Sequence, residues 1–507
     1  MRKAIDDFLN KTTMYRLLIY YLGGLLAIAF VVGLFGNLGF SPVALLVSTT
    51  ILLTACWMSN RIFAFVFHAP VNPESSLITA LILALLITPK LGLYDITFLL
   101  AASGLAMASK YILTINDVHI FNPAALAVVI TAVGPRQNAS WWIGTAVMLP
   151  FVLAGGILVV RKIRREQMVI SFFITTFVAT ALFTWFGGGD MLTAIKQTAL
   201  TSPVFFLGFV MLTEPLTSPG TKSKQAWFGV LVGLLVPPQV HFGGFYTSPE
   251  LALVIGNIFA YILDPRVRLF PVLTQKFRIA ASSADFVFNP GKRLAYRPGQ
   301  YMEWTLPHDH IDSRGNRRYF TLASSPTEPT LRLGVKFYDP SSSYKKAMLD
   351  MTSKTKIVAA QVAGDFVLPR SRKRKLVFIA GGIGVTPFRS MVKYLIDKHE
   401  RRDVITLYAA RNAQDIAYTN VFEQARQELG IATTYVLARQ DPTQPLGAYQ
   451  RAGYIDGSAI RAAVPDYRDR TFYISGSHQM VVAVQDALTN LGVPKRHIKI
   501  DYFPGYS

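Results

Sequence analysis

The chain has 507 residues, enough for two or three domains, of which 51% are hydrophobic and only 16% charged. A mean hydropathy of +0.34 excludes an ordinary soluble protein, and the charged residues exclude a chain that lies wholly in a membrane. The net charge of +21 is compatible with nucleic-acid binding, but much of the excess lies beside apolar segments, so we expect no nucleic-acid partner. The single cysteine, Cys56, excludes a cysteine-ligated iron–sulfur cluster, a CxxC redox pair and an internal disulfide.

The first half of the chain is dominated by apolar segments. Met1–Arg16 alternates charged and apolar residues, which predicts a short interfacial helix, and no cleavage site of small residues follows it, so we expect no cleaved signal peptide. Many of the segments that follow are near the ~20 residues that cross a bilayer. We predict ten membrane spans: Leu17–Leu34, Pro42–Met58, Leu77–Ile87, Ile96–Leu113, Phe121–Val133, Trp142–Val160, Met168–Phe186, Pro203–Leu216, Trp227–Gln239 and Leu251–Leu263.

The basic residues predict the orientation of these spans. Clusters of Lys and Arg precede the first span and follow the sixth, eighth and tenth, and with ten spans all of them fall on one side of the membrane. Basic loops face the cytoplasm, while the opposite loops here carry little positive charge. We therefore expect a multi-pass protein of the cell's inner, cytoplasmic membrane with both termini in the cytosol.

Polar residues and prolines interrupt two of the predicted spans. His119 and Asn122 stand at the mouth of one, and Thr213 and Glu214 stand near the cytosolic end of another. Backbone that is broken at membrane depth must be buried in protein or line a cavity, and ionisable residues there are commonly functional. These four residues are candidates for a redox or cavity site. Helix capping and interhelical hydrogen bonding are the alternative for His119 and Asn122, and an interfacial helix end is the alternative for Glu214.

The sequences VHIFNPAALA (Val118–Ala127) and TEPLTSP (Thr213–Pro219) resemble a family of membrane subunits. Members of this family occur in the sodium-pumping NADH:quinone reductase and in the Rnf complex, and the resemblance covers about residues 15–265. It implies flavin in the membrane half. Members attach FMN to a threonine in a Ser-Gly-Ala-Thr type of sequence, which this chain lacks, so we expect any second flavin, FMN or riboflavin, to bind noncovalently.

From residue 275 to residue 370, short strands separated by Gly/Pro turns predict a small antiparallel barrel. The run Arg318-Tyr319-Phe320-Thr321 combines an arginine for a phosphate, an aromatic ring for stacking and a hydroxyl for a ring nitrogen, which suits a flavin nucleotide. An ordinary barrel strand with alternating faces is the alternative. Ser342 and Ser343 begin a predicted helix and form a second anion site.

Lys375–Ser390 predicts a buried strand, a loop with Gly381, Gly382 and Gly384, and a helix start. Glycines let a backbone approach phosphates, and the N–H groups of a helix start favour an anion, to which the Thr386 hydroxyl can add a bond. A tight turn without a ligand is the alternative. The rest of this region alternates strands and helices, which predicts a parallel, doubly wound sheet with strands Leu376–Ala380, Val404–Ala409, Thr433–Leu437 and Thr471–Ser475.

Five motifs in this order resemble the ferredoxin–NADP reductase superfamily over about residues 275–507. They are Arg297–Tyr301 (RPGQY), Arg318–Thr321 (the RxFT form of RxYS), Ser341–Lys345 (SSxxK), Gly381–Pro387 (GGIGVTP) and the Gly-Ser turn after Ser475. The resemblance implies that Arg318, Phe320 and Thr321 bind FAD, with its pyrophosphate at Ser342 and Ser343. It further implies that Gly381–Thr386 bind the nicotinamide dinucleotide. Ser475 stands where many members have a cysteine beside the nicotinamide, and Phe503 is a candidate to shield the flavin, with edge packing as its alternative.

Together these patterns predict three domains: a transmembrane helical domain (1–268), an FAD-binding barrel (275–370) and an NAD(P)-binding α/β domain (371–507). We expect an oxidoreductase that moves electrons from cytosolic NADH or NADPH through FAD to an extracytosolic flavoprotein or quinone, with Thr321 and Ser475 at the reacting atoms. A hydrocarbon core of ~30 Å is a long gap for one electron-transfer step, which implies a further redox centre in the membrane.

Two other functions stay open. A redox-coupled ion pump or transporter fits the broken helices. A haem-containing transmembrane reductase needs axial ligands, usually paired histidines, whereas His68, His119 and His241 lie near span ends and never two in one span. The sequence predicts no metal site, and it leaves NADH and NADPH undistinguished.

Overall fold

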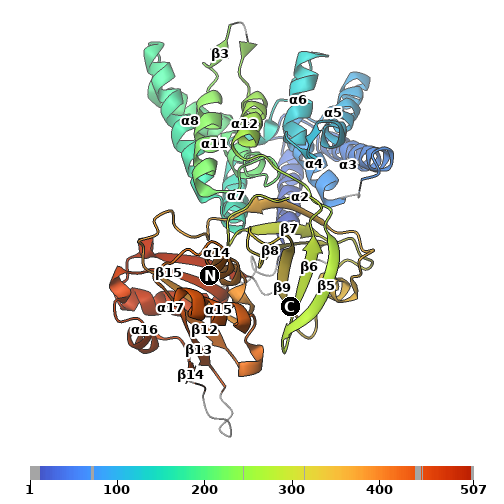
Figure 1. Cartoon of the computed structure of the whole chain (residues 1–507). Helices are drawn as coiled ribbons and strands as arrows, with labels where there is room; N and C mark the ends of the chain where they lie inside the picture. The colour runs from blue at the N-terminus through green and yellow to red at the C-terminus, as the bar shows by residue number, and fades with distance from the viewer. Residues whose placement is uncertain are drawn as a thin grey trace. The chain divides into compact units, whose positions relative to one another are not determined.

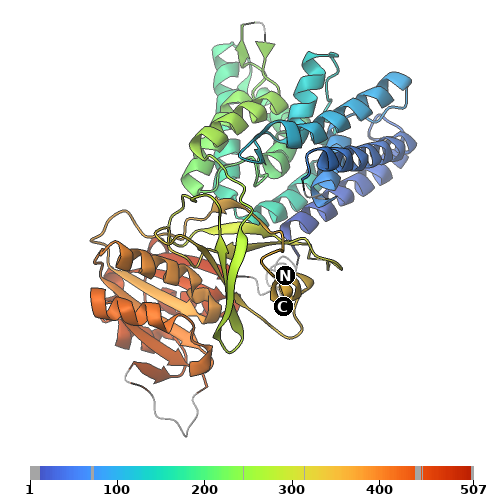
Figure 2. The ribbon, with the colours of Figure 1, turned by 45° about the vertical axis from the view of Figure 1, so that its right-hand side comes forward.

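The computed structural model describes residues 12–69, 73–243, 245–312, 314–439, 447 and 449–503. The chain divides into two compact units, Met1–Val267 and Arg268–Ser507. Figures 1 and 2 show the first unit as a bundle of helices and the second as strands and helices together. Of the predicted interfacial helix, residues 1–11 lie outside the described part of the chain.

The first unit consists of apolar helices joined by turns and two small hairpins. Ser41, Asn122 and Ser248 begin three of these helices, because each side chain accepts a hydrogen bond from a backbone N–H of the first turn. The helices are α2 (Met14–Leu34), α3 (Pro42–Val66), α4 (Pro73–Leu86), α5 (Leu93–Ile112), α6 (Pro123–Val133), α7 (Leu149–Ile163), α8 (Glu166–Phe186), α9 (Met191–Thr201), α10 (Val204–Phe206), the π-helix η2 (Leu207–Met211), α11 (Lys222–Leu235) and α12 (Pro249–Leu263), with the 3-10 turn η1 (Trp142–Gly144) before α7. The hairpins are β1–β2 (Thr114–Ile115, Val118–His119) and β3–β4 (His241–Phe242, Phe245–Tyr246).

The predicted count of ten membrane spans is corrected by the lengths and the apolar composition of these helices. Within the described residues, three helices, α2, α3 and α8, are long and apolar enough to cross a membrane. A fourth span results only if α9 and Val204–Met211, which meet at a bend of 63°, are taken as one. Several other predicted spans correspond to helices that are too short to cross a bilayer. For example, α6 has 11 residues and a length of about 16 Å, which is roughly half the thickness of the hydrocarbon core. The sequence count was too high because prolines and polar residues end helices inside apolar segments.

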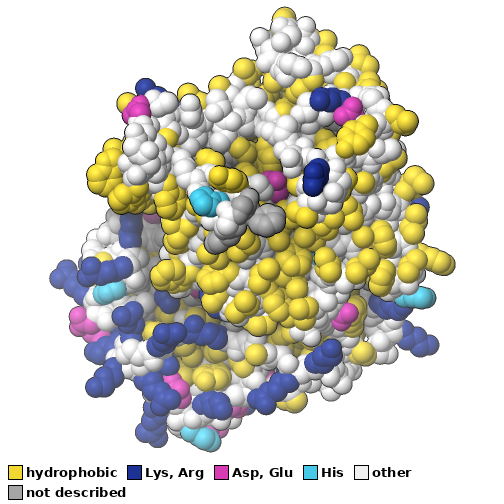
Figure 3. Space-filling view, turned by 90° about the horizontal axis from the view of Figure 1, so that it is seen from above, with side chains coloured by type: hydrophobic (Ala, Val, Ile, Leu, Met, Phe, Trp, Pro, Cys, Tyr) yellow, Lys and Arg dark blue, Asp and Glu magenta, His cyan; other side chains and the backbone are white. Residues whose placement is uncertain are grey.

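Apolar side chains remain on the outside of the helical unit. Phe35, Phe65, Leu93 and Phe186 are each at least 76% exposed, which is unusual for large apolar residues of a protein in water. Figure 3 shows apolar side chains spread widely over the face that it presents. Such a surface is suited to contact with lipid.

The barrel region of the second unit has two antiparallel sheets of three strands each. One has the order β5-β6-β9 and the other has the order β10-β7-β8. Trp304 is fully buried and its ring lies 5.0 Å from that of Phe288, so side chains of both sheets meet in one core. The arrangement is compatible with the predicted barrel. Its elements are β5 (Val272–Ala280), β6 (Ser283–Asn289), β7 (Tyr301–Thr305), β8 (Arg317–Thr321), β9 (Leu331–Lys336), the helix α13 (Ser343–Asp350) and β10 (Val358–Ala363).

The α/β region has a six-stranded sheet in the order β14-β13-β12-β11-β15-β16, and all neighbouring strands are parallel. Alternate residues of the central strand face opposite cores: Phe378 packs with Phe388 of α14, and Ile379 packs with Val484 of α17. Helices therefore cover both faces, as predicted for a doubly wound sheet. The strands are β11 (Leu376–Gly381), β12 (Val404–Ala410), β13 (Ala432–Leu437), β14 (Gln450–Ala452), β15 (Thr471–Ser477) and β16 (Ile498–Phe503), and the helices are α14 (Thr386–Asp397), α15 (Thr419–Leu429), α16 (Gly457–Ala463) and α17 (His478–Asn490).

Candidate functional site

Strand β8 carries the residues predicted to hold the flavin. Arg318 and Phe320 share a face of the strand and approach the ring of Tyr344 on α13, at 5.0 Å from the guanidinium carbon and 6.1 Å between ring centroids. Thr321 is buried, and its hydroxyl has no hydrogen-bond partner within the described residues. Tyr319 lies on the outside and donates its hydroxyl to Gln361 Oε1 at 3.3 Å. A buried hydroxyl without a protein partner fits a bound cofactor atom.

The start of α13 gathers positive charge. Burial, together with the nearby charges of Arg318, Arg314 and Lys336, lowers the pKa of Lys345 to about 8. Ser342 caps the helix by accepting a hydrogen bond from the backbone N–H of Lys345. Four cations beside a capped helix N-terminus, where backbone N–H groups point outward, fit the pyrophosphate of a dinucleotide such as FAD.

Ser343 is less available to a phosphate than the sequence suggested. Its hydroxyl accepts a hydrogen bond from the Asp312 backbone N–H at 3.1 Å and lies 3.1 Å from His308 Nε2. The Asp312 carboxylate in turn accepts the Ser343 backbone N–H at 3.0 Å. Partial burial acts to raise the pKa of Asp312, but hydrogen bonds from Arg314 and the Ser343 backbone outweigh it and lower the pKa to about 2. The sequence analysis did not single out Asp312. The only available signal was weak: an acidic residue in a turn shortly before a strand that begins with two arginines.

The glycine loop of the α/β region packs against the end of β15. An added Cβ at Gly384 would lie 2.6 Å from the backbone N and Cα of Gly476, so only glycine fits there. Gly382 has a φ of +54°, a conformation that glycine adopts without strain. The Thr386 hydroxyl donates to Ile383 O at 3.2 Å and thus shapes the loop itself. The loop offers backbone N–H groups at the start of α14, which suits a pyrophosphate.

Ser475 lies at the same sheet edge as the glycine loop. It pairs with Ala380 of β11 on one side and with Asp501 of β16 on the other. Ser475 is fully buried, and no hydrogen-bond partner for its hydroxyl is present in the described part of the chain. Phe503 ends β16 beside Ser477, but its side chain lies outside the described residues. The carboxyl ends of parallel strands are where ligands bind in such sheets.

Three of the four candidates in the helical unit come together. Glu214 Oε2 accepts hydrogen bonds from Asn122 Nδ2 at 2.8 Å and from the Thr217 hydroxyl at 3.0 Å, and its Oε1 lies 3.9 Å from His119 Nε2. Asn257 of α12 accepts the Asn122 backbone N–H at 2.8 Å and donates to Thr217 O at 3.1 Å. We call these five residues the Glu214 cluster.

The Glu214 cluster differs from the sequence prediction in two respects. Thr213 is not part of it, because its hydroxyl donates to Phe209 O at 2.8 Å, back into the helix that precedes it. Asn257 and Thr217 were missed. The sequence did carry a signal for Asn257, because it is a polar residue inside the otherwise apolar helix Pro249–Leu263, and polar residues in such helices need hydrogen-bond partners.

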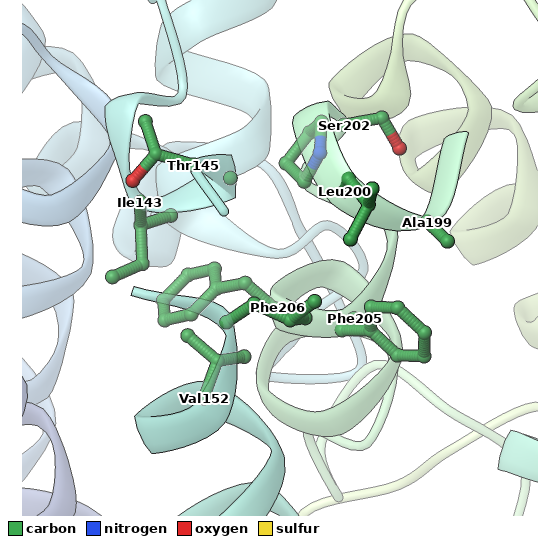
Figure 4. Close-up of a pocket in the computed structure, with 11 residues that line it drawn as sticks. Ile143, Thr145, Val152, Ala199, Leu200, Ser202, Phe205 and Phe206 are labelled. Carbon is green, nitrogen blue, oxygen red and sulfur yellow. The ribbon is translucent and has the colours of Figure 1, made fainter. Parts of the chain in front are cut away.

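A small pocket lies elsewhere in the helical unit. Figure 4 shows Phe205, Phe206 and Val152 around it, and Thr145 and Ser202 contribute polar groups. None of these residues belongs to a motif that the sequence analysis singled out. The residues that line this pocket are distinct from those of the Glu214 cluster.

The second unit thus combines a barrel region and an α/β region that carry candidate flavin and dinucleotide sites, and the first unit consists of apolar helices. Residues 378–486 match the family model of the oxidoreductase NAD-binding domain, and residues 136–270 match that of the NQR2, RnfD, RnfE family. Both predicted resemblances are confirmed by these matches. They support a nicotinamide dinucleotide as a cofactor and a membrane protein.

Similar curated proteins are flavohemoproteins. That of Halalkalibacterium halodurans is 28% identical over 246 residues, and that of Bacillus subtilis is 27% identical over 238 residues, in both cases covering 46% of this chain. The chain spans 59% and 58% of the length of these relatives. Among solved structures, the FAD/NAD-binding domain of a nitric oxide dioxygenase from Vibrio cholerae is 23% identical with a TM-score of 0.41, and covers 46% of this chain and 98% of that one.

Proposed function

We propose that the chain is an NAD(P)H-dependent flavin oxidoreductase that passes electrons from cytosolic NADH or NADPH through FAD into the membrane. The observation that carries this proposal is the gathering of Arg314, Arg318, Lys336 and Lys345 at the start of α13, beside the strand with Thr321. FAD, when bound, accepts a hydride and passes electrons on singly. The match of residues 378–486 to an NAD-binding domain supports the dinucleotide as the electron source.

The residues of the chain take separate roles in this proposal. Arg318 and Lys345 hold the pyrophosphate of FAD, with the ring system against Phe320 and the Thr321 hydroxyl. The loop Gly381–Thr386 holds the pyrophosphate of the dinucleotide, and Ser475 lies beside the nicotinamide. No acid–base group is required, because the protein positions the two cofactors and excludes water. The three predicted domains, 1–268, 275–370 and 371–507, remain part of the proposal.

The helical unit carries the electrons further. Its match to the NQR2, RnfD, RnfE family and its exposed apolar side chains support a place in the cytoplasmic membrane. The basic clusters support an orientation with both termini in the cytosol. We propose a noncovalent FMN or riboflavin at the Glu214 cluster, since amide, hydroxyl and imidazole groups gather there and can exchange their present contacts with Glu214 for hydrogen bonds to a flavin ring. An extracytosolic flavoprotein or a quinone is the proposed acceptor.

Cofactor content tests this proposal directly. We expect about one FAD per chain plus FMN or riboflavin in protein purified in detergent, with no haem absorbance, when the supernatant of acid-precipitated protein is separated by chromatography. FAD alone would remove the membrane flavin from the proposal. Haem would replace it with a haem-based pathway, and the absence of FAD would overturn the proposal as a whole.

Replacing Asn257 by alanine is expected to remove most of the second flavin and to leave FAD in place. The variant loses the amide that joins the Asn122 backbone to Thr217 O, and it leaves a buried N–H and a buried carbonyl unpaired, at a cost of about 1–3 kcal/mol each. The measurement is the ratio of the two flavins to protein. Asn60→Ala is the matched control, since Asn60 is equally buried but accepts its hydrogen bond from Tyr111. Equal flavin loss in both variants would contradict the assignment.

FAD binding is expected to weaken above about pH 8. In the free protein Lys345 has a pKa of about 8, and a bound pyrophosphate raises that pKa by favouring the charged form. Affinity is therefore constant below about pH 7 and then falls, by up to about tenfold per pH unit, until the pH reaches the pKa of the complex. Fluorescence titration of the apoprotein with FAD at a series of pH values between 6 and 10 measures the affinity for FAD as a function of pH. Lys345→Gln should bind more weakly at pH 7 and lose this dependence, and an unchanged pH profile would refute the role of Lys345.

A redox-coupled ion pump is the second candidate function. The short helices α6 and α12 meet where Asn257 accepts the Asn122 backbone N–H, and Asn122 also donates to the partly buried Glu214 carboxylate. Broken helices with an ionisable residue beside them are found where ions cross membranes. Turnover in proteoliposomes that depends on sodium and on the membrane potential would support pumping. Turnover that ignores both would exclude it and leave electron transfer alone.

A further inference from the structure

The barrel and the α/β region of the second unit are joined by a largely buried ion pair that the proposed function does not use. Arg389 of α14 donates from Nη2 to Glu328 Oε1 at 2.9 Å and from Nη1 to Glu328 Oε2, so the pair is bidentate. The side chain of Arg389 is 6% exposed and that of Glu328 is 13% exposed. Glu328 lies in the β8–β9 connection, and we call this pair the Arg389–Glu328 latch.

The latch also holds the backbone immediately after the flavin strand. Arg389 Nη1 donates to Ala323 O at 2.9 Å, and Glu328 Oε2 accepts the Ser325 backbone N–H at 2.7 Å. Next to Arg389, the Ser390 hydroxyl donates to Ser324 O at 2.6 Å. The segment held in this way begins two residues after Thr321.

On the other side, the latch is close to the dinucleotide loop. Arg389 follows Thr386 by three residues in the first turn of α14. Strand β9 of the barrel approaches the same loop, since an added Cβ at Gly334 would lie 2.8 Å from Thr386 Cγ2 and 3.2 Å from Ile383 Cδ1. A second buried contact joins the two regions where the Tyr418 hydroxyl donates to Asp285 Oδ1 at 3.0 Å. Side-chain contacts therefore connect the segment that follows the flavin strand β8 to the dinucleotide loop and α14.

We propose that Arg389 and Glu328 are positioning residues for hydride transfer, because the latch fixes the separation of the flavin site from the nicotinamide site. This inference rests on the proposed function. In the reaction NAD(P)H is oxidised to NAD(P)⁺ and FAD gains the hydride with its two electrons, so no other reactant is needed. Such a transfer requires reacting atoms about 3–3.5 Å apart, and a displacement of 1 Å can lower the rate about a hundredfold.

The chemistry of the Arg389–Glu328 pair suits a role in fixing the relative position of the two regions and not a large contribution to the free energy of unfolding. Buried ion pairs contribute little net stability, because the cost of removing two charges from water offsets most of their attraction. A bidentate arginine–carboxylate contact, however, fixes both distance and orientation. The latch joins side chains of the two regions, whereas both residues of the Arg402–Glu400 pair, at 2.6 Å and similarly buried, belong to the α/β region.

Glu328→Gln in the full-length protein tests the proposal, with Glu400→Gln as the matched control. The limiting rate of FAD reduction at saturating NAD(P)H, measured by stopped-flow absorbance, should fall at least about tenfold in Glu328→Gln. FAD content and the dinucleotide Kd should stay within about twofold, and the isotope effect with 4-deuterated dinucleotide should remain fully expressed. Glu400→Gln should match the wild type within about twofold.

Several outcomes would overturn the inference. An unchanged limiting rate in Glu328→Gln with FAD bound would show that the latch does not position the cofactors, and loss of FAD in proportion to the rate would reduce it to a structural support. If Glu328→Gln does not fold, Arg389→Lys is the second variant, because it keeps the positive charge but removes the bidentate guanidinium contact. It must then show the same selective loss in the limiting rate of FAD reduction. Wild-type protein whose FAD neither NADH nor NADPH reduces would instead overturn the proposed function.

Discussion

Alanine in place of Gly384 is expected to slow the reduction of bound FAD by NAD(P)H at least about a hundredfold, with FAD retained. The added Cβ would lie 2.6 Å from Gly476 N, Gly476 Cα and Ser475 O, all of which are backbone atoms. A side chain can rotate away from such a contact, but a strand backbone cannot, so the loop and the end of β15 must separate. That movement displaces both the proposed pyrophosphate site and Ser475.

The measurement is the rate of flavin bleaching on mixing with excess NADH and, separately, NADPH, together with the flavin-to-protein ratio. Gly457→Ala is the control in the same region, since the nearest atoms to its added Cβ belong to the Leu491 side chain at 3.8 Å. Reduction of the Gly384 variant at the wild-type rate would place the dinucleotide elsewhere. A variant without FAD would show that the substitution disrupts more than the loop.

Arg318→Ala is expected to yield protein with less than about a tenth of the FAD of the wild type, with the helical unit still inserted. A charge-assisted hydrogen bond contributes about 1.5–3 kcal/mol, which corresponds to roughly a tenfold to 150-fold loss of affinity. The structure adds a second cause. Arg318 Nη1 donates to the backbone oxygens of Arg314 at 2.8 Å, Gly315 at 3.1 Å and Arg317 at 2.7 Å, so the turn before β8 also depends on it.

Titration of the apoprotein with FAD separates these two causes. Arg318→Lys keeps the charge but cannot reproduce the planar fork, so it should bind FAD more tightly than the alanine variant and less tightly than the wild type. Arg293→Ala removes an exposed arginine of the same region and should leave the FAD content unchanged. Stoichiometric FAD in Arg318→Ala would show that the flavin is bound by other residues.

The error in the span count has a physical cause that concerns the whole helical unit. Hydropathy averages over a window and so registers apolar residues whether or not the backbone stays helical. Pro123 begins α6 and thereby shortens one predicted span, and Pro215 follows the last turn of another. Helices that end inside apolar segments bring polar groups together, and two members of the Glu214 cluster, Asn122 and Glu214, directly precede these prolines.

The sequence by itself determined the local elements of the second unit. The apolar run Leu376–Ala380, its glycines and Pro387 specify strand, loop and helix through short-range sterics and hydrogen bonding, and the structure has all three in place. The capping of α13 by Ser342 is equally local. Cofactor classes followed from these elements because phosphate recognition uses backbone N–H groups and nearby cations.

Only the tertiary structure decided which distant residues meet. Asn257 joins Asn122 across 135 positions of sequence, and Arg389 joins Glu328 across 61. Neither partnership leaves a periodic signal, because it depends on how helices and strands pack and not on the order of residues along one of them. Local patterns therefore predicted candidate segments for cofactors, whereas the contacts between residues far apart in the sequence required the folded chain.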